Sequence, residues 1–340
     1  MNIGYILILI ASFFLGTFGI GMKYNKPLAW ENFWSIHVMV GMFLVPVIWA
    51  LLVVPDLYEV IVSSPLSNIL KCMFFGFLWG IGGMFFGMGV KYVGISLTYG
   101  VVMGICGVLG SIIPLLQVQN AQNTPGFKFI ILGNLVMLAG VGICAYAGTK
   151  RERRTTALGQ QIEGIQSGRG YKIGMLIVIF SAVLSSFINI GFANATPIIN
   201  NAVAHGTLPR NASLAAWVVV LAGAFIFNIF YVLIQLVRNN TWSSYFAPKS
   251  FNAYKWAILS AILFFGYAGI YGQGTVLLGD IGPIVGWPIL LSLSLIFSNM
   301  LAVKTGEWQG HKDLVGLLFA GVVVLIAASL ILSYANTLTN

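Results

Sequence analysis

Residues 127–154 read FKFIILGNLVMLAGVGICAYAGTKRERR, an apolar run that ends in a cluster of basic residues. The apolar part, 127–148, is long enough to cross the hydrocarbon core of a bilayer, for which a helix needs about 20 residues. The basic part is too costly to place in that core. The stretch therefore predicts a transmembrane helix followed by a charged connection at a membrane surface.

The rest of the chain has a similar composition. Of its 340 residues, 59% are hydrophobic and only 7% are charged, and the mean hydropathy is +0.93. Soluble domains carry about 25% charged residues, so this chain could not cover its own surface in water. Such high hydrophobicity also excludes a disordered chain. The predicted fold class is an all-α polytopic membrane protein, which excludes soluble enzymes and DNA-binding domains.

Ten runs are long and apolar enough to span a membrane. They cover residues 3–22, 34–54, 69–90, 95–117, 127–148, 173–195, 212–237, 256–278, 282–303 and 314–334.

The basic residues indicate which connections face the cytoplasm. The connections after odd-numbered spans hold 14 of the 17 Lys and Arg residues, and those after even-numbered spans hold 3. Positive charge gathers in cytoplasmic loops. We therefore expect a bacterial inner-membrane protein with both termini in the periplasm. This placement accounts for the net charge of +9 without a nucleic-acid partner.

The longest polar stretch divides the ten spans into two sets of five. We expect a first five-helix repeat over 1–148, a basic cytoplasmic linker over 149–172 and a second five-helix repeat over 173–340. Because five is an odd number, the two repeats would be inverted relative to each other. Inverted repeats are typical of secondary transporters, which hold their substrate near the membrane midplane.

A glycine pattern supports the repeat. The motif G-x-G-x-x-x-x-G occurs after the third span and again after the eighth, which are equivalent positions in the two halves. Its glycines are Gly87, Gly89 and Gly94 in the first half, and Gly272, Gly274 and Gly279 in the second. Glycines four residues apart within the third and fourth spans, such as Gly76 and Gly80, favour close helix packing.

No catalytic motif appears in the chain. It has no Ser/His/Asp set, no H-E-x-x-H sequence and no nucleotide-binding Gly-Lys loop. Cys72, Cys106 and Cys144 lie in or beside apolar runs without metal-ligand spacing, which is typical of small buried side chains. We expect a protein that is not an enzyme and has no cofactor or metal site.

The spans instead carry neutral polar and aromatic side chains. Polar groups at membrane depth are candidates for function, although an amide there also serves as an interhelical hydrogen bond. Amides and hydroxyls both donate and accept hydrogen bonds, which suits the hydroxyls of a sugar. The candidate substrate-binding residues are Trp79, Tyr99, Asn189, Asn194, Asn228, Tyr267, Tyr271, Gln273 and Trp287.

Several blocks resemble a known family. Lys23 to Ser35 reads K-x-x-K-x-x-x-W-E-x-x-W-S, 78–82 reads L-W-G-I-G, and Gly87 to Ser96 reads G-x-x-x-K-Y-x-G-x-S. Asn194 precedes Pro197, and Glu307-Trp308 precedes the last span. In this order the blocks resemble the L-rhamnose–proton symporter family, a branch of the drug/metabolite transporter superfamily. The resemblance implies ten helices as two inverted repeats.

We therefore expect a secondary transporter that imports a monosaccharide, L-rhamnose or a related deoxyhexose, by proton symport with alternating access. Four residues are candidates for proton coupling: Asp280, Glu31, Glu307 and His37. Asp280 follows Gln273 by seven residues, so the two would share a face if the helix continued that far. Glu31 and Glu307 have an alternative role, which is pairing with nearby lysines at the cytoplasmic rim.

Other readings of the same residues remain open. A drug or metabolite exporter of the same superfamily would move an aromatic cation outward. A receptor or scaffold would bind a ligand without transport, but the chain holds no long tail for signalling. The coupling ion could also be a cation other than the proton. We expect a monomer surrounded by membrane lipid.

Overall fold

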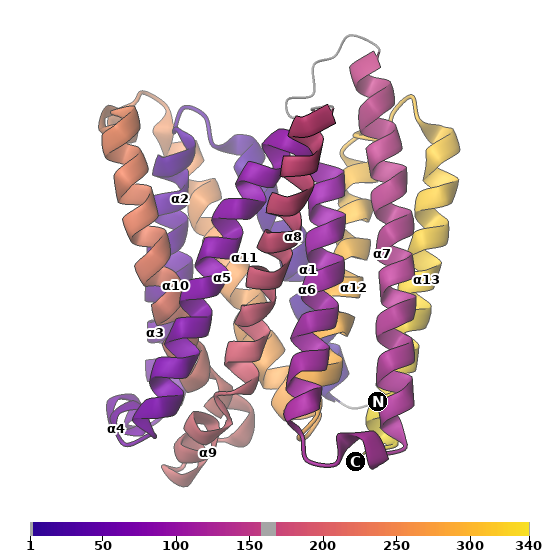
Figure 1. Ribbon diagram of the computed structural model, residues 1–340. Helices are drawn as coiled ribbons and strands as arrows, with labels where there is room; N and C mark the ends of the chain where they lie inside the picture. Colours follow the sequence, from indigo (N-terminus) through magenta and orange to yellow (C-terminus); the bar gives the residue numbers. More distant parts are fainter. Residues whose placement is uncertain (1–2, 158–167, 340) are drawn as a thin grey trace. The chain divides into compact units, whose positions relative to one another are not determined.

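The computed structural model describes residues 3–157 and 168–339 (Figure 1). Within these ranges the regular secondary structure is entirely helical. The π-helical turn is η2, and the other η elements are 3₁₀ helices. In chain order the elements are α1 (Ile3–Thr17), η1 (Phe18–Tyr24), α2 (Trp30–Val38), η2 (Met39–Leu44), α3 (Val45–Val53), α4 (Leu57–Val62), α5 (Leu66–Val93), α6 (Ile95–Gln117), η3 (Ala121–Asn123), α7 (Gly126–Ala157), α8 (Gly168–Ala193), α9 (Thr196–Ala204), α10 (Pro209–Asn239), η4 (Trp242–Phe246), α11 (Ser250–Val276), α12 (Gly282–Lys304) and α13 (Lys312–Thr337).

The ten predicted spans are confirmed. Within the described ranges, ten helical segments are long and apolar enough to cross a membrane, and each overlaps one predicted run. Three of these segments combine consecutive elements: α1 with η1, α2 with η2 and α3, and α8 with α9. The chain is therefore a multi-pass membrane protein.

The fifth span ends later than predicted. The sequence predicts that the helix stops at 148, but α7 continues to Ala157. Residues 149–157 hold no proline or glycine, and Lys, Arg and Glu are good helix formers. Arg154 also donates to Asp313 of α13 over 2.7 Å, which holds this end of α7 in place. The middle of the predicted linker, 158–167, lies outside the described residues.

The chain folds into two compact units. The first unit combines Met1–Gly80 with Gly191–Leu278, and the second combines Ile81–Ile190 with Gly279–Asn340. Each unit therefore contains helices from both halves of the sequence. The division into repeats at 1–148 and 173–340 concerns internal symmetry and stays a prediction.

Small residues let helices approach closely in the first unit. A methyl group at Gly76 of α5 would collide with the Val220 carbonyl of α10, and one at Gly223 of α10 would collide with the Met73 carbonyl of α5. The two backbones are thus in direct contact where α5 and α10 cross, as small residues permit in membrane helices.

In the second unit, α7 packs against α13. Cys144 of α7 and Leu318 and Leu325 of α13 are buried in one hydrophobic core. Gly321 of α13 faces Cys144 of α7 so closely that a methyl group there would lie 2.6 Å from the sulfur. This packing holds α7 as one long helix, and one face of α7 lines the groove described below.

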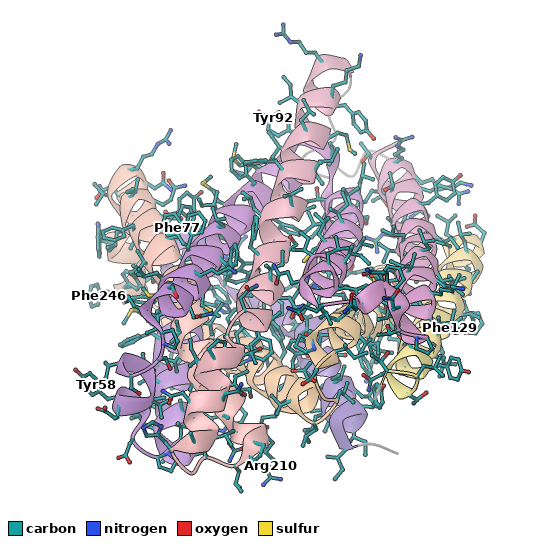
Figure 2. The ribbon with its side chains drawn as sticks, turned by 60° about the horizontal axis from the view of Figure 1, so that its bottom comes forward. Tyr58, Phe77, Tyr92, Phe129, Arg210 and Phe246 are labelled. Atoms are coloured by element: carbon teal, nitrogen blue, oxygen red, sulfur yellow. The ribbon has the colours of Figure 1, made fainter. Side chains whose placement is uncertain are left out.

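Large apolar side chains also point away from the ribbon. Tyr58 and Phe246 of the first unit do so in Figure 2, with exposed fractions of 77% and 90%. Within the spans, Leu176 of α8 and Leu330 of α13 are likewise exposed. A soluble protein would not tolerate so many exposed apolar groups, whereas in a bilayer they face lipid.

Candidate functional site

The first unit contains a cluster of aromatic and amide side chains from four elements. Trp34 and His37 stand three residues apart on α2, so their rings lie on one helix face and stack with centroids 4.5 Å apart and planes 11° apart. The indole nitrogen of Trp34 donates to Asn228 Oδ1 of α10 over 3.1 Å. Helices α2 and α10 therefore supply the first three members of the cluster.

Phe264 of α11 joins the remaining members. Its ring centroid lies 5.1 Å from that of His37, 5.9 Å from that of Trp79 on α5, and 5.4 Å from that of Tyr267. The structure thus brings together four predicted site residues: His37, Trp79, Asn228 and Tyr267. The aromatic–amide cluster consists of these four residues with Trp34 and Phe264.

The cluster has a buried side and a partly exposed side. His37, Asn228, Phe264 and Tyr267 are buried, whereas the indoles of Trp34 and Trp79 are only partly covered. An apolar surface with a few oriented polar groups behind it is the usual composition of a small-molecule site.

His37 contributes an unused hydrogen-bonding atom. It is fully buried, and Ser260 Oγ lies 3.3 Å from its Nδ1. Nε2 is buried and has no hydrogen-bond partner among the described residues. A buried polar atom without a partner costs about 1–3 kcal/mol, so this nitrogen marks a place where a hydrogen-bonding group of a ligand would be stabilising.

The local backbone also changes at His37. One residue after it, the α-helix α2 gives way to the π-helical turn η2. Gly41 in this turn packs against the Ala261 carbonyl of α11, to which a methyl group would come within 2.9 Å. Single π-helical turns are frequent at functional sites. Here the turn comes just after His37, whose Nε2 has no hydrogen-bond partner among the described residues.

Tyr271 belongs to a different group in the first unit. Its ring centroid lies 5.9 Å from that of Phe192 and 6.4 Å from that of Trp217, and these two rings stack at 4.6 Å. All three side chains are fully buried. The structure places Tyr271 in a packed aromatic core.

Asn194 and Gln273 bind other side chains of the first unit. Lys71 Nζ of α5 donates to Asn194 Oδ1 over 2.6 Å, just after α8 ends. Gln273 Nε2 donates to Asn211 Oδ1 of α10 over 3.1 Å. Lys71 stands eight residues before Trp79 on α5, a rise of about 12 Å, so Asn194 is held well away from the aromatic–amide cluster.

Three predicted site residues lie in the second unit and link its helices. Asn189 Nδ2 of α8 donates to the Gly110 carbonyl of α6 over 2.8 Å and to the Pro283 carbonyl of α12 over 3.1 Å. Trp287 Nε1 of α12 donates to the Cys106 carbonyl over 3.1 Å. Tyr99 of α6 lies close to Ser294 of α12. These groups connect α6, α8 and α12 within the unit.

The three predicted carboxylates have different surroundings. Glu31 is buried and accepts hydrogen bonds from Asn239 over 3.0 Å and from Thr241 over 2.7 Å. Glu307 lies 3.5 Å from Arg151 in a partly exposed ion pair.

Asp280 is exposed in the turn between α11 and α12. The expectation that it shares a helix face with Gln273 is wrong, because α11 ends at Val276 and the backbone turns at Gly279 with a φ of 86°. That region of backbone space favours glycine. The helical spacing therefore does not reach Asp280.

Sequence reasoning missed a buried carboxylate, Glu152. It was assigned to the linker, but it lies inside α7, where its side chain is 1% exposed. One oxygen accepts from the backbone N–H and the hydroxyl of Ser96, and the other has no partner in the described ranges. The absence of helix breakers before Ala157 was the signal that could have placed it.

Trp34 and Phe264 were also missed as site residues. Trp34 could have been found from its three-residue spacing to His37 on a helix, whereas nothing local identifies Phe264. Its role follows from contacts with α2 and α5, which are distant in the sequence.

The chain is similar to known proteins along almost its whole length. Residues 1–336 match the sequence profile of the family described as L-rhamnose-proton symport protein (RhaT). The L-rhamnose-proton symporter of Yersinia pestis bv. Antiqua (strain Antiqua) is 28% identical over 338 residues, which cover 96% of each chain. The L-rhamnose-proton symporter of Yersinia pseudotuberculosis serotype O:1b (strain IP 31758) is 28% identical over 339 residues with the same coverage. The match runs through both units, and the chain therefore belongs to the family of L-rhamnose-proton symport proteins.

Proposed function

We propose that this protein imports L-rhamnose or a related deoxyhexose together with protons, by alternating access in the inner membrane. The observation that carries the proposal is the family match over 1–336. The relatives are named as symporters rather than enzymes, and the ten apolar helices suit a transporter. The exporter reading is not favoured, because the matching family and relatives are symporters.

The proposal includes the drug/metabolite transporter fold with two inverted repeats at 1–148 and 173–340. Two glycines support it. Gly94 and Gly279 occupy the last position of the repeated glycine motif, and both have a φ of 86° at the turn between two spans. Equivalent positions in the two halves thus share one unusual backbone conformation. The cytoplasmic side is the one that holds the basic connections, which leaves both termini in the periplasm.

We further propose the aromatic–amide cluster as the sugar site. The partly exposed indoles of Trp34 and Trp79 offer apolar faces for the C–H face and the methyl group of a deoxyhexose. Asn228 already accepts from Trp34, so its amide is oriented, as specificity requires. The other predicted residues, Tyr99, Asn189, Asn194, Tyr271, Gln273 and Trp287, remain candidates for binding or for holding the helices.

His37 is the group in this cluster that can carry a proton. Its Nε2 is buried without a hydrogen-bond partner among the described residues, and the His37 ring contacts Trp34 and Phe264 of the same cluster. Protonation would convert this nitrogen into a donor, and a sugar hydroxyl would satisfy it. Sugar and proton would then favour each other's binding, as symport requires. Asp280, Glu31 and Glu307 are the alternative coupling groups.

Uptake by purified protein in proteoliposomes tests the transport function. With an acidic exterior and a negative interior, labelled L-rhamnose should accumulate, and a proton ionophore should abolish the accumulation. One proton crossing ~150 mV supplies ~3.5 kcal/mol, which corresponds to a concentration ratio of a few hundred. If a gradient of another cation drives the accumulation instead, that cation is the coupling ion. Efflux of an aromatic cation without sugar uptake would contradict the proposal.

A further inference from the structure

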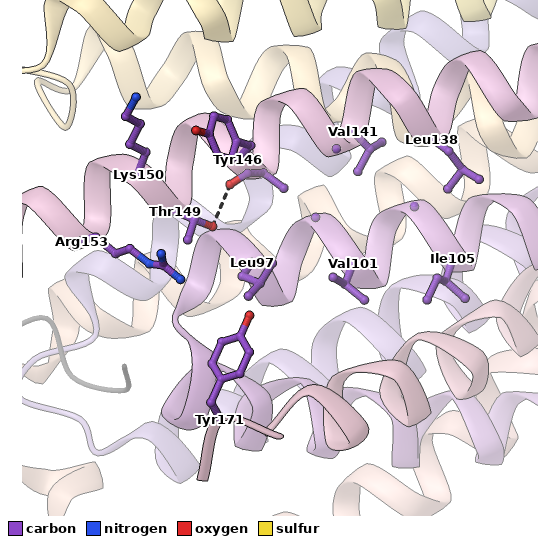
Figure 3. Close-up of a pocket in the computed structure, with 14 residues that line it drawn as sticks. Leu97, Val101, Ile105, Leu138, Val141, Tyr146, Thr149, Lys150, Arg153 and Tyr171 are labelled. Atoms are coloured by element: carbon purple, nitrogen blue, oxygen red, sulfur yellow. Dashed lines mark hydrogen bonds between the residues drawn. The ribbon is translucent and has the colours of Figure 1, made fainter. Parts of the chain in front are cut away.

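A groove of about 670 Å³ lies within the second unit (Figure 3), and its lining includes none of the residues proposed above for the sugar. Its walls are one face of α6 and one face of α7, and Tyr171 at the start of α8 lies at one end. Leu97, Val101 and Ile105 follow one another on α6 at the four-residue spacing of a single helix face. Leu138 and Val141 stand opposite them on α7.

Glycine leaves the floor of the groove open. A methyl group at Gly142 of α7 would have no atom within 4 Å, although the helix is packed along much of its length. By contrast, Gly100 of α6 meets the side chain of Ala145 so closely that no methyl group fits. The helices thus touch at Gly100 and separate beside Gly142, and this leaves a slot lined by apolar side chains.

One end of the groove is basic and aromatic. Tyr146, Thr149, Lys150 and Arg153 continue the same face of α7, and all of them line the groove. Figure 3 shows Arg153 reaching towards Leu97, with the hydroxyl of Tyr171 directed to the same end. The groove therefore changes from apolar to cationic along its length.

The two cations at this end differ from their neighbours on α7. Arg151 lies 3.5 Å from Glu307, and Arg154 lies 2.7 Å from Asp313, so both have carboxylate partners. No carboxylate pairs with Lys150 or Arg153 in the part of the chain that the structure describes. The positive charge at the groove is thus not neutralised by a described side chain, although carboxylates stand nearby.

The dimensions of the groove match one membrane leaflet. The apolar part of the α7 wall runs from Leu138 to Tyr146, which is about 12 Å of helix. Half of a bilayer's hydrocarbon core is about 15 Å thick. Tyrosines are enriched at the level of the headgroups, where Tyr146 and Tyr171 would then lie. The basic end belongs to the connection with the most Lys and Arg, the proposed cytoplasmic side, where anionic lipids are abundant.

We propose that this groove binds one anionic phospholipid. An acyl chain lies between α6 and α7 over Gly142, and the phosphate lies between Lys150 and Arg153. Basic pockets between transmembrane helices bind anionic headgroups in this way. The groove shares no residue with the aromatic–amide cluster, and the choice of leaflet rests on the proposed orientation.

Native mass spectrometry of the full-length protein in detergent tests the proposal. The protein is titrated with dioleoyl phosphatidylglycerol or dioleoyl phosphatidylcholine, two lipids with the same acyl chains. We expect one phosphatidylglycerol to be retained at concentrations where phosphatidylcholine is lost. In K150Q/R153Q its affinity should fall about thirtyfold, since each basic residue near a membrane surface contributes roughly fivefold.

Two matched controls separate this groove from general effects. R169Q/K172Q removes the same charge from exposed positions near the start of α8 that do not line the groove, and it should retain phosphatidylglycerol. G142L fills the groove and should lose the lipid. G316L on α13 makes the same change at another open glycine and should keep it. If G142L does not fold, the comparison of K150Q/R153Q with R169Q/K172Q still tests the proposal.

Three results would overturn the proposal. Equal retention of the two lipids would show that the cations do not select a headgroup. Displacement of the lipid by glycerol phosphate alone would indicate a site for a free anion. Displacement by L-rhamnose would assign the groove to the sugar.

Discussion

Replacing His37 with phenylalanine should uncouple sugar movement from the proton gradient without unfolding the protein. The phenyl ring keeps the flat surface that stacks on Trp34 at 4.5 Å and contacts Phe264, but it lacks both ring nitrogens. If His37 carries the proton, the variant should let L-rhamnose equilibrate across the membrane but should not concentrate it.

The effect on stability follows from the partners of the two nitrogens. The substitution removes the 3.3 Å contact between Nδ1 and Ser260 Oγ and leaves that buried hydroxyl without this partner, at a cost of about 1–3 kcal/mol. It also removes the buried Nε2, which has no hydrogen-bond partner among the described residues and whose burial costs about 1–3 kcal/mol. The two effects are of similar size, so the stability of the variant should lie within about 2 kcal/mol of that of the parent.

Proteoliposome uptake and thermal unfolding in detergent measure the two effects. At ~150 mV the parent should reach a concentration ratio of a few hundred, and H37F a ratio near one with sugar exchange retained. His205, which is bonded through Nδ1 to the Asn201 carbonyl at the end of α9, provides the matched control. H205F should accumulate sugar like the parent. Undiminished accumulation by H37F would refute its role in coupling, and a markedly lower melting temperature would refute the stability argument.

Three further predictions concern the site, the alternative coupling group and the orientation. Trp79→Ala should weaken sugar binding measured by ligand-induced thermal stabilisation; unchanged affinity in Trp79→Ala with weaker binding in Asn194→Ala or Gln273→Ala would place the sugar outside the aromatic–amide cluster. Asp280→Asn, in an exposed turn, should leave accumulation intact in the same uptake assay if His37 couples; exchange without accumulation would instead assign coupling to Asp280. In intact cells, an impermeant thiol reagent should label a cysteine introduced at Asn340 but not one introduced at Thr156, with little background because Cys72, Cys106 and Cys144 are buried; the opposite pattern would reverse the orientation.

Local composition was sufficient to predict the membrane spans. A helix in lipid satisfies its backbone hydrogen bonds internally, so about 20 apolar residues form a span whatever their neighbours are. The ends were less certain. α7 continues past 148 because residues 149–157 favour a helix and Arg154 pairs with Asp313. That continuation buries Glu152, which sequence reasoning had left in the linker.

The candidate site could be predicted only in part, because the residue types do not show their partners. Trp79, Asn228, Tyr267 and His37 were identified individually as polar or aromatic groups at membrane depth. Their meeting around Phe264, together with Trp34, depends on contacts among α2, α5, α10 and α11. Conversely, Asn189 and Trp287 looked similar in the sequence but hydrogen-bond to backbone carbonyls of neighbouring helices.

The amino-acid sequence by itself determined that this chain crosses a membrane ten times and which stretches do so, because hydrophobicity acts on each segment independently. The tertiary structure decided which helices are neighbours and therefore which side chains form a site. Lipid is as apolar as the helices, so hydrophobicity does not select helix partners there. Partners are selected by close approach at small residues, such as Gly76 and Gly223, and by hydrogen bonds between helices, such as that from Trp34 to Asn228.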